Sequence, residues 1–146
     1  MVLIDVNILL YAFRSDSPDH KAYRNWLESV VNSEEPYGLA DAALASFVRI
    51  ATHPRIFTPP APLEEALRFA GALRERPNCV PVSPGPRYWE IFARLCKAAG
   101  AKGNIVADAA FAALAVETGC EWVTTDRDYS RFPGLKWRHP LSKGKP

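Results

Sequence analysis

The sequence predicts one α/β domain in which helices cover both faces of a parallel sheet. Short apolar stretches alternate with longer segments whose apolar residues recur at helical spacing, and this alternation is typical of parallel sheets. The first stretch, residues 2–11, has no polar face and interrupts its apolar run only at Asp5 and Asn7, so we expect a central strand buried on both sides. A chain of 146 residues has the length of a single domain, and we expect one domain over residues 1–146.

The first helix after this strand is predicted from its start signal. Ser17 is a suitable N-cap, Pro18 fits the first helical position, and Asp19 places an acid in the first turn. Apolar residues then recur at helical spacing as far as Val31. A second helix is expected over residues 40–51.

The second half of the chain continues the alternation, and glycines end two of its helices, as is common at helix C-termini. After a proline-rich connection over residues 58–62, the expected elements are a helix from Pro62, a strand over 79–82, a helix over 87–99 before Gly100, a helix over 105–118 before Gly119, and strands over 122–125 and 137–139. Parallel sheets of this kind bind ligands beyond the carboxyl ends of their strands, where the strand order switches direction.

Composition excludes several classes of protein. No apolar run approaches the ~20 residues of a membrane span, and no basic segment precedes the apolar run 8–13, so we expect a cytoplasmic protein without membrane association. The cysteines Cys79, Cys96 and Cys120 form no CxxC pair and show no metal-ligand spacing with the histidines. We therefore expect buried, reduced thiols.

Positive charge is concentrated at the C-terminal end of the chain. The net charge is +2, but residues 127–146 hold six Lys or Arg against the single acid Asp128. A basic tail over about residues 140–146 could contact phosphates. The alternative is a solvated C-terminus with no ligand.

Three carboxylates occupy positions where a charge is costly to bury. Asp5 lies in the apolar opening stretch, Asp108 lies one turn into an alanine-rich helix, and Asp126 follows the strand WVTT. Asp108 could simply complement the helix dipole and Asp126 could be a turn residue, but a strand offers Asp5 no such function. If all three meet at one edge of the sheet, their repulsion favours a bound Mg²⁺ or Mn²⁺, as in metal-dependent nucleases and phosphatases.

Four stretches carry a resemblance that covers essentially the whole chain. They are LIDVNILLYAF at the start, FVRIATHPRIF at 47–57, GNIVADAAFAALAVETG at 103–119 and VTTDRDYSRFPGLKWRHPL at 123–141. In order and spacing they resemble the PIN-domain ribonucleases that act as toxins of VapBC-type toxin–antitoxin pairs, the VapC family. The resemblance implies a three-layer α/β/α PIN domain with a central, mostly parallel sheet.

The resemblance also implies an active site for a metal-dependent endoribonuclease. Its catalytic acids would be Asp5, Asp41, Asp108 and Asp126. Mg²⁺ (or Mn²⁺) would be bound by Asp5, Asp108 and Asp126. Asn7, Thr125 and Asp128 fall where family members often have polar support for metal, water or substrate.

The fourth acid is the position where this sequence departs from the family. Family members usually have a glutamate on the second helix, and two registers place it either on Asp41 or on Ser46. We favour Asp41, whose shorter side chain could reach a metal through water; a spacing of five residues means that both can scarcely point to one place. Arg49, His53 and Arg55 are candidates for RNA phosphate contact or for a structural polar network.

Partners and alternatives follow from the same resemblance. It implies a homodimer and a complex with a cognate VapB-type antitoxin, and a free toxin that cleaves structured RNA such as tRNA to inhibit translation. The main alternative is a catalytically impaired PIN-like binding module. A haloacid-dehalogenase-type phosphotransferase would require an aspartate at position 7, where this chain has Asn7, and a receiver domain would require an acceptor aspartate within residues 47–57, which contain none.

Overall fold

A computed structural model describes residues 1–142 of the protein. The four residues that follow, which include Lys143 and Lys145 of the predicted basic tail, lie outside the described part. No helix within residues 1–142 is long and apolar enough to cross a lipid bilayer.

The elements alternate along the chain as the sequence predicts. In order they are β1 (Val2–Ile4), α1 (Val6–Phe13), α2 (His20–Val31), β2 (Tyr37–Ala40), α3 (Asp41–Ala51), α4 (Leu63–Arg74), β3 (Cys79–Val82), α5 (Tyr88–Ala99), α6 (Asn104–Thr118), β4 (Glu121–Val123), the 3-10 helix η1 (Arg127–Arg131) and β5 (Trp137–Arg138).

The five strands form one parallel sheet in the order β3-β2-β1-β4-β5. In the register, Leu3 of the central strand β1 is paired with Gly38 of β2 on one side and with Trp122 of β4 on the other. The chain first builds outward from β1 through β2 to β3, and then returns to place β4 on the opposite side of β1. The strand order therefore switches direction between β1 and β4, where a parallel sheet opens a crevice for a ligand.

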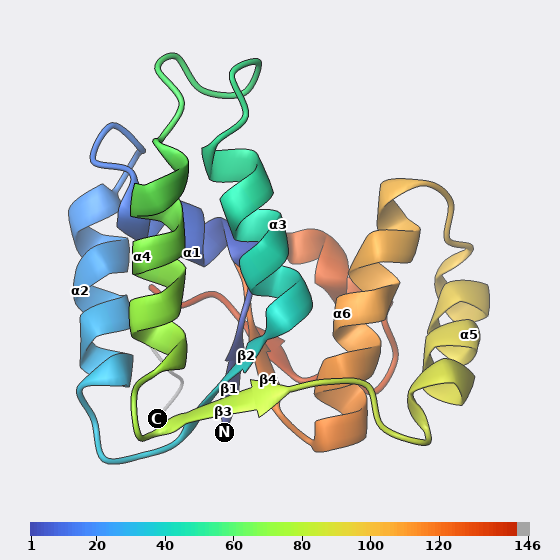
Figure 1. The fold of residues 1–146 in the computed structure, drawn as a ribbon. Helices are drawn as coiled ribbons and strands as arrows, with labels where there is room; N and C mark the ends of the chain where they lie inside the picture. The colour runs from blue at the N-terminus through green and yellow to red at the C-terminus, as the bar shows by residue number, and fades with distance from the viewer. Residues whose placement is uncertain (143–146) are drawn as a thin grey trace.

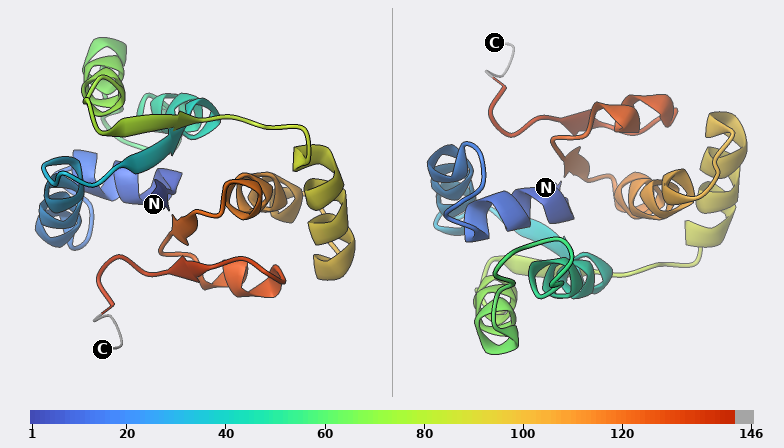
Figure 2. Two further views of the ribbon diagram at one scale, coloured as in Figure 1. Left: turned by 90° about the horizontal axis from the view of Figure 1, so that it is seen from below. Right: turned by 90° about the horizontal axis from the view of Figure 1, so that it is seen from above.

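Helices flank the sheet in two groups (Figures 1 and 2). Helix α1 packs on α2 and α3, and α3 packs on α4, so these four helices form one group. Helices α5 and α6 pack against each other on the opposite side. This arrangement confirms the predicted α/β class, with a parallel sheet between helical layers.

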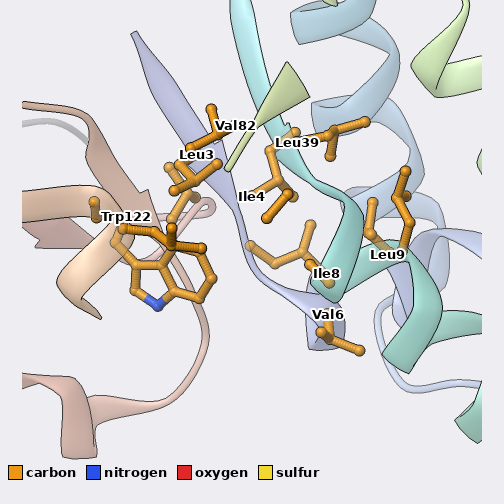
Figure 3. Close-up of a cluster of buried hydrophobic side chains, with 14 of the residues drawn as sticks. Leu3, Ile4, Val6, Ile8, Leu9, Leu39, Val82 and Trp122 are labelled. Atoms are coloured by element: carbon orange, nitrogen blue, oxygen red, sulfur yellow. The ribbon is translucent and has the colours of Figure 1, made fainter. Parts of the chain in front are cut away.

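The core explains why the strands have no polar face. Leu3 and Ile4 point to opposite sides of β1, and both are fully buried (Figure 3). On one side, Leu3 approaches Val82 across Gly38, because a Cβ added to this glycine would lie 3.2 Å from Leu3 Cδ1 and 3.1 Å from Val82 Cγ2. Trp122 is the largest fully buried side chain of the molecule's described part.

The predicted strand over residues 2–11 is wrong in its second half. The strand ends at Ile4, and residues 6–13 form helix α1. The run is apolar throughout because α1 is packed between the sheet and its neighbouring helices, with Val6, Ile8 and Leu9 among its buried residues. Periodicity alone cannot distinguish a buried strand from a short buried helix.

Three other expectations need correction. The strand β2 was not predicted, since its four residues follow no pattern and include a glycine. Helix α2 begins only at His20, and Ser17 does not cap it: its hydroxyl donates instead to the carbonyls of Tyr11 and Arg14. The third difference concerns β4, which ends at Val123, two residues before the predicted end.

Candidate active site

The carboxylates of Asp5, Asp108 and Asp126 line one pocket beyond the carboxyl ends of β1 and β4. The pocket, hereafter the acid pocket, has a volume of about 280 Å³, and its walls come from α1, α3, α6 and the segment after β4. It lies at the point where the strand order switches direction. The structure therefore brings together the three acids that the sequence selects as metal ligands.

Asp5 is held in place as the N-cap of α1. Its backbone is extended, with φ −75° and ψ 155°, and its Oδ1 accepts a hydrogen bond from the backbone N–H of Val6 at 2.6 Å. The residue is only 6% exposed. Burial raises the pKa of Asp5 to about 6, and repulsion by Asp108 and Asp126 adds to this, while hydrogen bonds from Thr124 and Val6 partly offset it. A nearby cation would favour the ionised form.

The side chain of Thr124 links Asp5, Asn7 and the backbone of Asp126 by hydrogen bonds. This fully buried hydroxyl donates to Asp5 Oδ2 at 2.6 Å and accepts from Asn7 Nδ2 at 3.3 Å and from the backbone N–H of Asp126 at 3.0 Å. The sequence predicts Thr125 for this role, but Thr125 is half-buried and makes none of these three hydrogen bonds. Because β4 ends at Val123, its neighbour Thr124 is the buried threonine, and no signal in the sequence separates the two.

Asn7 contributes an unsatisfied acceptor to the same region. Its Nδ2 is bonded to Thr124, but its buried Oδ1 has no hydrogen-bond partner within residues 1–142. Unpaired buried acceptors are uncommon in native proteins and usually indicate a missing water or ion. The expected supporting position of Asn7 is therefore consistent with the geometry.

Asp108 projects into the acid pocket from the second turn of α6. Its Oδ1 accepts a hydrogen bond of 3.4 Å from the hydroxyl of Tyr129. Burial raises the pKa of Asp108, and repulsion by Asp126 raises it further. Burial and the surrounding acids also raise the pKa of Tyr129, so this phenol stays a donor. Tyr129 was not selected from the sequence, where nothing distinguishes it from a core aromatic residue.

Asp126 repeats the arrangement of Asp5 at the end of β4. It is the N-cap of η1, and its Oδ1 accepts from the backbone N–H of Asp128 at 2.8 Å. Asp128 supports the site through this backbone group only: its own carboxylate is exposed, pairs with Arg131 at 3.4 Å and does not line the acid pocket.

The structure does not bring Asp41 to the other acids, and in this respect the favoured register needs correction. Asp41 begins α3, is largely exposed, and pairs with Arg74 at 2.8 Å. This pairing lowers the pKa of Asp41. Ser46, one turn further along α3, lines the acid pocket instead. Of the two candidate positions, the one that faces the three acids therefore carries a serine.

Of the three basic candidates, only Arg49 lines the acid pocket. It forms no ion pair with any carboxylate among residues 1–142, so its charge is available to a ligand. His53 and Arg55 lie in the turn after α3, where the backbone N–H of Arg55 donates to His53 Nδ1 at 3.1 Å. Neither of these two residues lines the acid pocket.

The donors of the acid pocket suit a hard divalent cation, although they do not form a closed ligand cage. Within the described residues, no three His, Cys, Asp or Glu side chains are close enough together to hold an ion by themselves. Mg²⁺, however, usually keeps several waters and needs only one or two carboxylates. Carboxylate and amide oxygens are its preferred ligands. The raised pKa of Asp5 and of Asp108 comes mainly from burial and, to a smaller extent, from repulsion by the neighbouring acids.

Comparison with known proteins places the chain in a family. The PIN domain model matches residues 2–135. Ribonuclease VapC43 of Mycobacterium tuberculosis is 43% identical over 141 residues, covering 97% of this chain and 96% of the relative. Ribonuclease VapC25 of the same organism is 39% identical over 140 residues, covering 96% and 99%.

Solved structures have the same fold at low sequence identity. The VapBC-1 structure from nontypeable Haemophilus influenzae superimposes with a TM-score of 0.68 at 19% identity, over 97% of this chain and 100% of the other. VapC20 of Mycobacterium tuberculosis gives a TM-score of 0.65 at 13% identity, over 92% and 98%. With the acid pocket at the strand switch and full-length relatives at 43% identity, the chain belongs to the VapC ribonucleases of the PIN-domain family.

Proposed function

We propose that the protein is a Mg²⁺- or Mn²⁺-dependent endoribonuclease and the toxin of a VapBC-type pair. The observation that carries this proposal is the convergence of Asp5, Asp108 and Asp126 in one pocket of a chain that belongs to the VapC ribonucleases. The structurally similar VapC20 is described as a toxin that cleaves the sarcin–ricin loop, which supports structured RNA as the substrate class. Cleavage of tRNA and inhibition of translation are part of the same proposal.

The metal would be held by Asp5, Asp108 and Asp126, with Asn7 Oδ1 and the Ser46 hydroxyl as neutral oxygens nearby. When bound, a divalent cation makes a coordinated water more acidic and offsets negative charge on the phosphate.

The protein's own residues would position the reacting groups. The Thr124 hydroxyl and the N–H groups of Val6 and Asp128 fix the carboxylates of Asp5 and Asp126. Arg49, which is not ion-paired within the described residues, would hold the RNA phosphate at the rim of the acid pocket. Hydrolysis then forms a bond from the water oxygen to phosphorus and breaks one P–O ester bond.

Two partners are part of the proposal. The VapBC complexes among the structural neighbours support a VapB-type antitoxin as the cognate partner. A homodimer is also proposed, and the exposed apolar side chains of Leu63 and Leu67 on α4 offer a surface for association. A cytoplasmic location is consistent with both partners.

A cleavage assay on a structured RNA, with and without metal, tests the proposal. We expect cleavage in Mg²⁺ or Mn²⁺ and none after chelation with EDTA. Equal cleavage with and without EDTA would contradict the metal-dependent mechanism. The serine at position 46 is the observation that favours the alternative of a catalytically impaired binding module, and RNA binding without cleavage in either metal would support that alternative.

A further inference from the structure

A second pocket opens directly beside the acid pocket, between α3 and α6. This side pocket has a volume of about 310 Å³, within the usual range of about 300–1,000 Å³ for ligand sites. Ser46, Ala107 and Phe111 line both pockets, so the two are adjacent and share a wall. A group bound in the acid pocket therefore has its immediate neighbour in the side pocket.

The walls of the side pocket are aromatic and small apolar side chains. Phe111 from α6 stacks on Trp122 with centroids 5.4 Å apart and an interplanar angle of 17°. Tyr88 from α5 stacks on Phe92 at 6.0 Å and 11°. Each ring is thus supported by a second aromatic residue, which fixes its orientation before a ligand arrives. Rigid aromatic rings bind nucleic-acid bases by stacking.

Few polar residues line the side pocket. Besides the phenol of Tyr88, they are Ser46, Ser83 and Asp41. The pairing with Arg74 keeps Asp41 ionised, so it is an acceptor. A few polar groups around an apolar floor suit the edge of a base, since carboxylates accept hydrogen bonds from exocyclic amino groups.

Glu117 fixes the segment over residues 83–88, which forms one wall of the side pocket, to helix α6, which forms another. This carboxylate, at the end of α6, accepts hydrogen bonds from the backbone N–H groups of Gly85 at 2.7 Å and Arg87 at 2.8 Å. A Cβ at position 85 would lie 2.8 Å from Glu117 Oε2, so the contact is tight. The segment that carries Ser83 and Tyr88 is therefore anchored on the same helix as Phe111, and the pocket is preformed.

From these observations we infer that the side pocket holds the base of the nucleotide next to the scissile phosphate. The inference rests on the proposed nuclease function. The wall shared with the acid pocket places the side pocket next to the metal-binding acids, the stacked rings suit a planar base, and Arg49, which lines the acid pocket, suits the linking phosphate. The side pocket thereby determines which bonds are cut.

Cleavage of a random pool of single-stranded RNA 12-mers, with sequencing of the products, tests this assignment. In the wild type we expect one position flanking the cut to show a base preference of about tenfold, the effect of hydrogen bonds to the edge of one base. The variant Ala110→Leu fills the side pocket without lining the acid pocket, and it should reduce this preference below about twofold because the base no longer reaches those polar groups. Tyr88→Leu, which removes a wall ring, should have the same effect.

The matched control is Ala45→Leu, the same substitution in a separate groove between α3 and α4. It should retain the wild-type preference. An unchanged preference in both Ala110→Leu and Tyr88→Leu, or a wild type without any preference, would overturn the inference. So would a finding that Ala110→Leu retains its base preference but no longer binds the antitoxin, because the side pocket would then belong to the protein partner.

A metal-free experiment separates failure of this inference from failure of the proposed function. Each of the four nucleoside 5′-monophosphates is titrated into the protein in EDTA, and amide NMR shifts are followed at Tyr88 and Ala110. We expect shifts in the wild type and in Asp5→Asn, and none in Ala110→Leu. If the wild type cleaves no RNA but shows these shifts, the nuclease proposal fails and the base pocket stands. Shifts confined to the acid pocket would refute the base pocket.

Discussion

Asp5 and Asp41 lie at equivalent junctions, where a parallel strand ends and a helix begins, yet their environments are opposite. Asp5 is the N-cap of α1, 6% exposed, with a pKa raised to about 6. Asp41 is the first helical residue of α3, because Ala40 occupies the N-cap position. Its side chain is 68% exposed, and Arg74 lowers its pKa.

A shift of one residue accounts for this difference. Successive residues of a helix are rotated by about 100° around its axis. An aspartate at the cap therefore faces the crevice at the strand ends, while an aspartate one position later faces another direction. Asp126, the N-cap of η1 after β4, follows the arrangement of Asp5 and lines the same pocket. The two acids that follow strands β1 and β4 thus reach the acid pocket from cap positions, while Asp108 reaches it from the second turn of α6.

The strongest test of the comparison is RNA cleavage by Asp5→Asn and Asp41→Asn. We expect Asp5→Asn to lose activity by more than about 100-fold, since even residues that only orient metal ligands contribute about 10- to 100-fold. Asp41→Asn, which lies outside the acid pocket and keeps an acceptor oxygen at the side pocket, should stay within about threefold of the wild type. The measurement is the initial rate on one RNA at saturating Mn²⁺.

The same two variants test whether Asp41 is the fourth catalytic acid. A loss in Asp41→Asn as large as that in Asp5→Asn would show that Asp41 acts in catalysis, and the comparison would be wrong. Ser46→Ala is the companion variant, because Ser46 lines the acid pocket. It should reduce the rate more than Asp41→Asn does.

Stability as a function of pH should distinguish the two aspartates by sign. A buried acid with a raised pKa stabilises the fold below its unfolded pKa of 3.8, and this stabilisation is lost as the pH rises through about 6. The free energy of unfolding of Asp5→Asn, relative to the wild type, should therefore rise by about 2 kcal/mol between pH 4 and pH 7. Denaturant unfolding in EDTA measures this difference.

Asp41→Asn should show the opposite sign in the same experiment. The lowered pKa of Asp41 gives a stabilisation that is present above pH 3.8 and is lost as the pH falls through the folded-state value. The variant should accordingly be slightly less stable than the wild type at pH 7 and equal to it in strong acid. Parallel pH profiles for the two variants would mean that burial does not govern the titration of Asp5.

The sequence predicts the three acids and the fold class, but it does not resolve positions that depend on where an element starts or stops. Residues 2–11 are uniformly apolar because both β1 and α1 are buried, so the boundary at Asp5 leaves no periodic signal. The choice between Asp41 and Ser46 depends on the first residue of α3, and the choice between Thr124 and Thr125 depends on the last residue of β4. Boundaries are set by tertiary packing, which a local pattern does not contain.

Substitution of Thr124, which is bonded to Asp5, or of Arg74, which is paired with Asp41, tests the comparison through protein stability, with the smallest expected effects. Thr124 is fully buried and connects Asp5, Asn7 and the backbone of Asp126, so Thr124→Val leaves the buried donor Asn7 Nδ2 and the carboxylate of Asp5 without this bond. We expect a loss of about 2 kcal/mol in the free energy of unfolding at pH 7, typical of a buried polar group that loses its partner. Thr125→Val, a half-buried neighbour, is the matched control and should change little.

Arg74→Met removes the partner of Asp41 and completes the comparison. This ion pair is solvent-exposed on both sides, and exposed pairs contribute little to stability. The unfolding midpoint of Arg74→Met should therefore coincide with that of the wild type, while Thr124→Val unfolds at a clearly lower denaturant concentration. Equal shifts in the two variants would mean that the acid pocket is as open to water as the start of α3, and that the cap position does not determine which aspartates are buried.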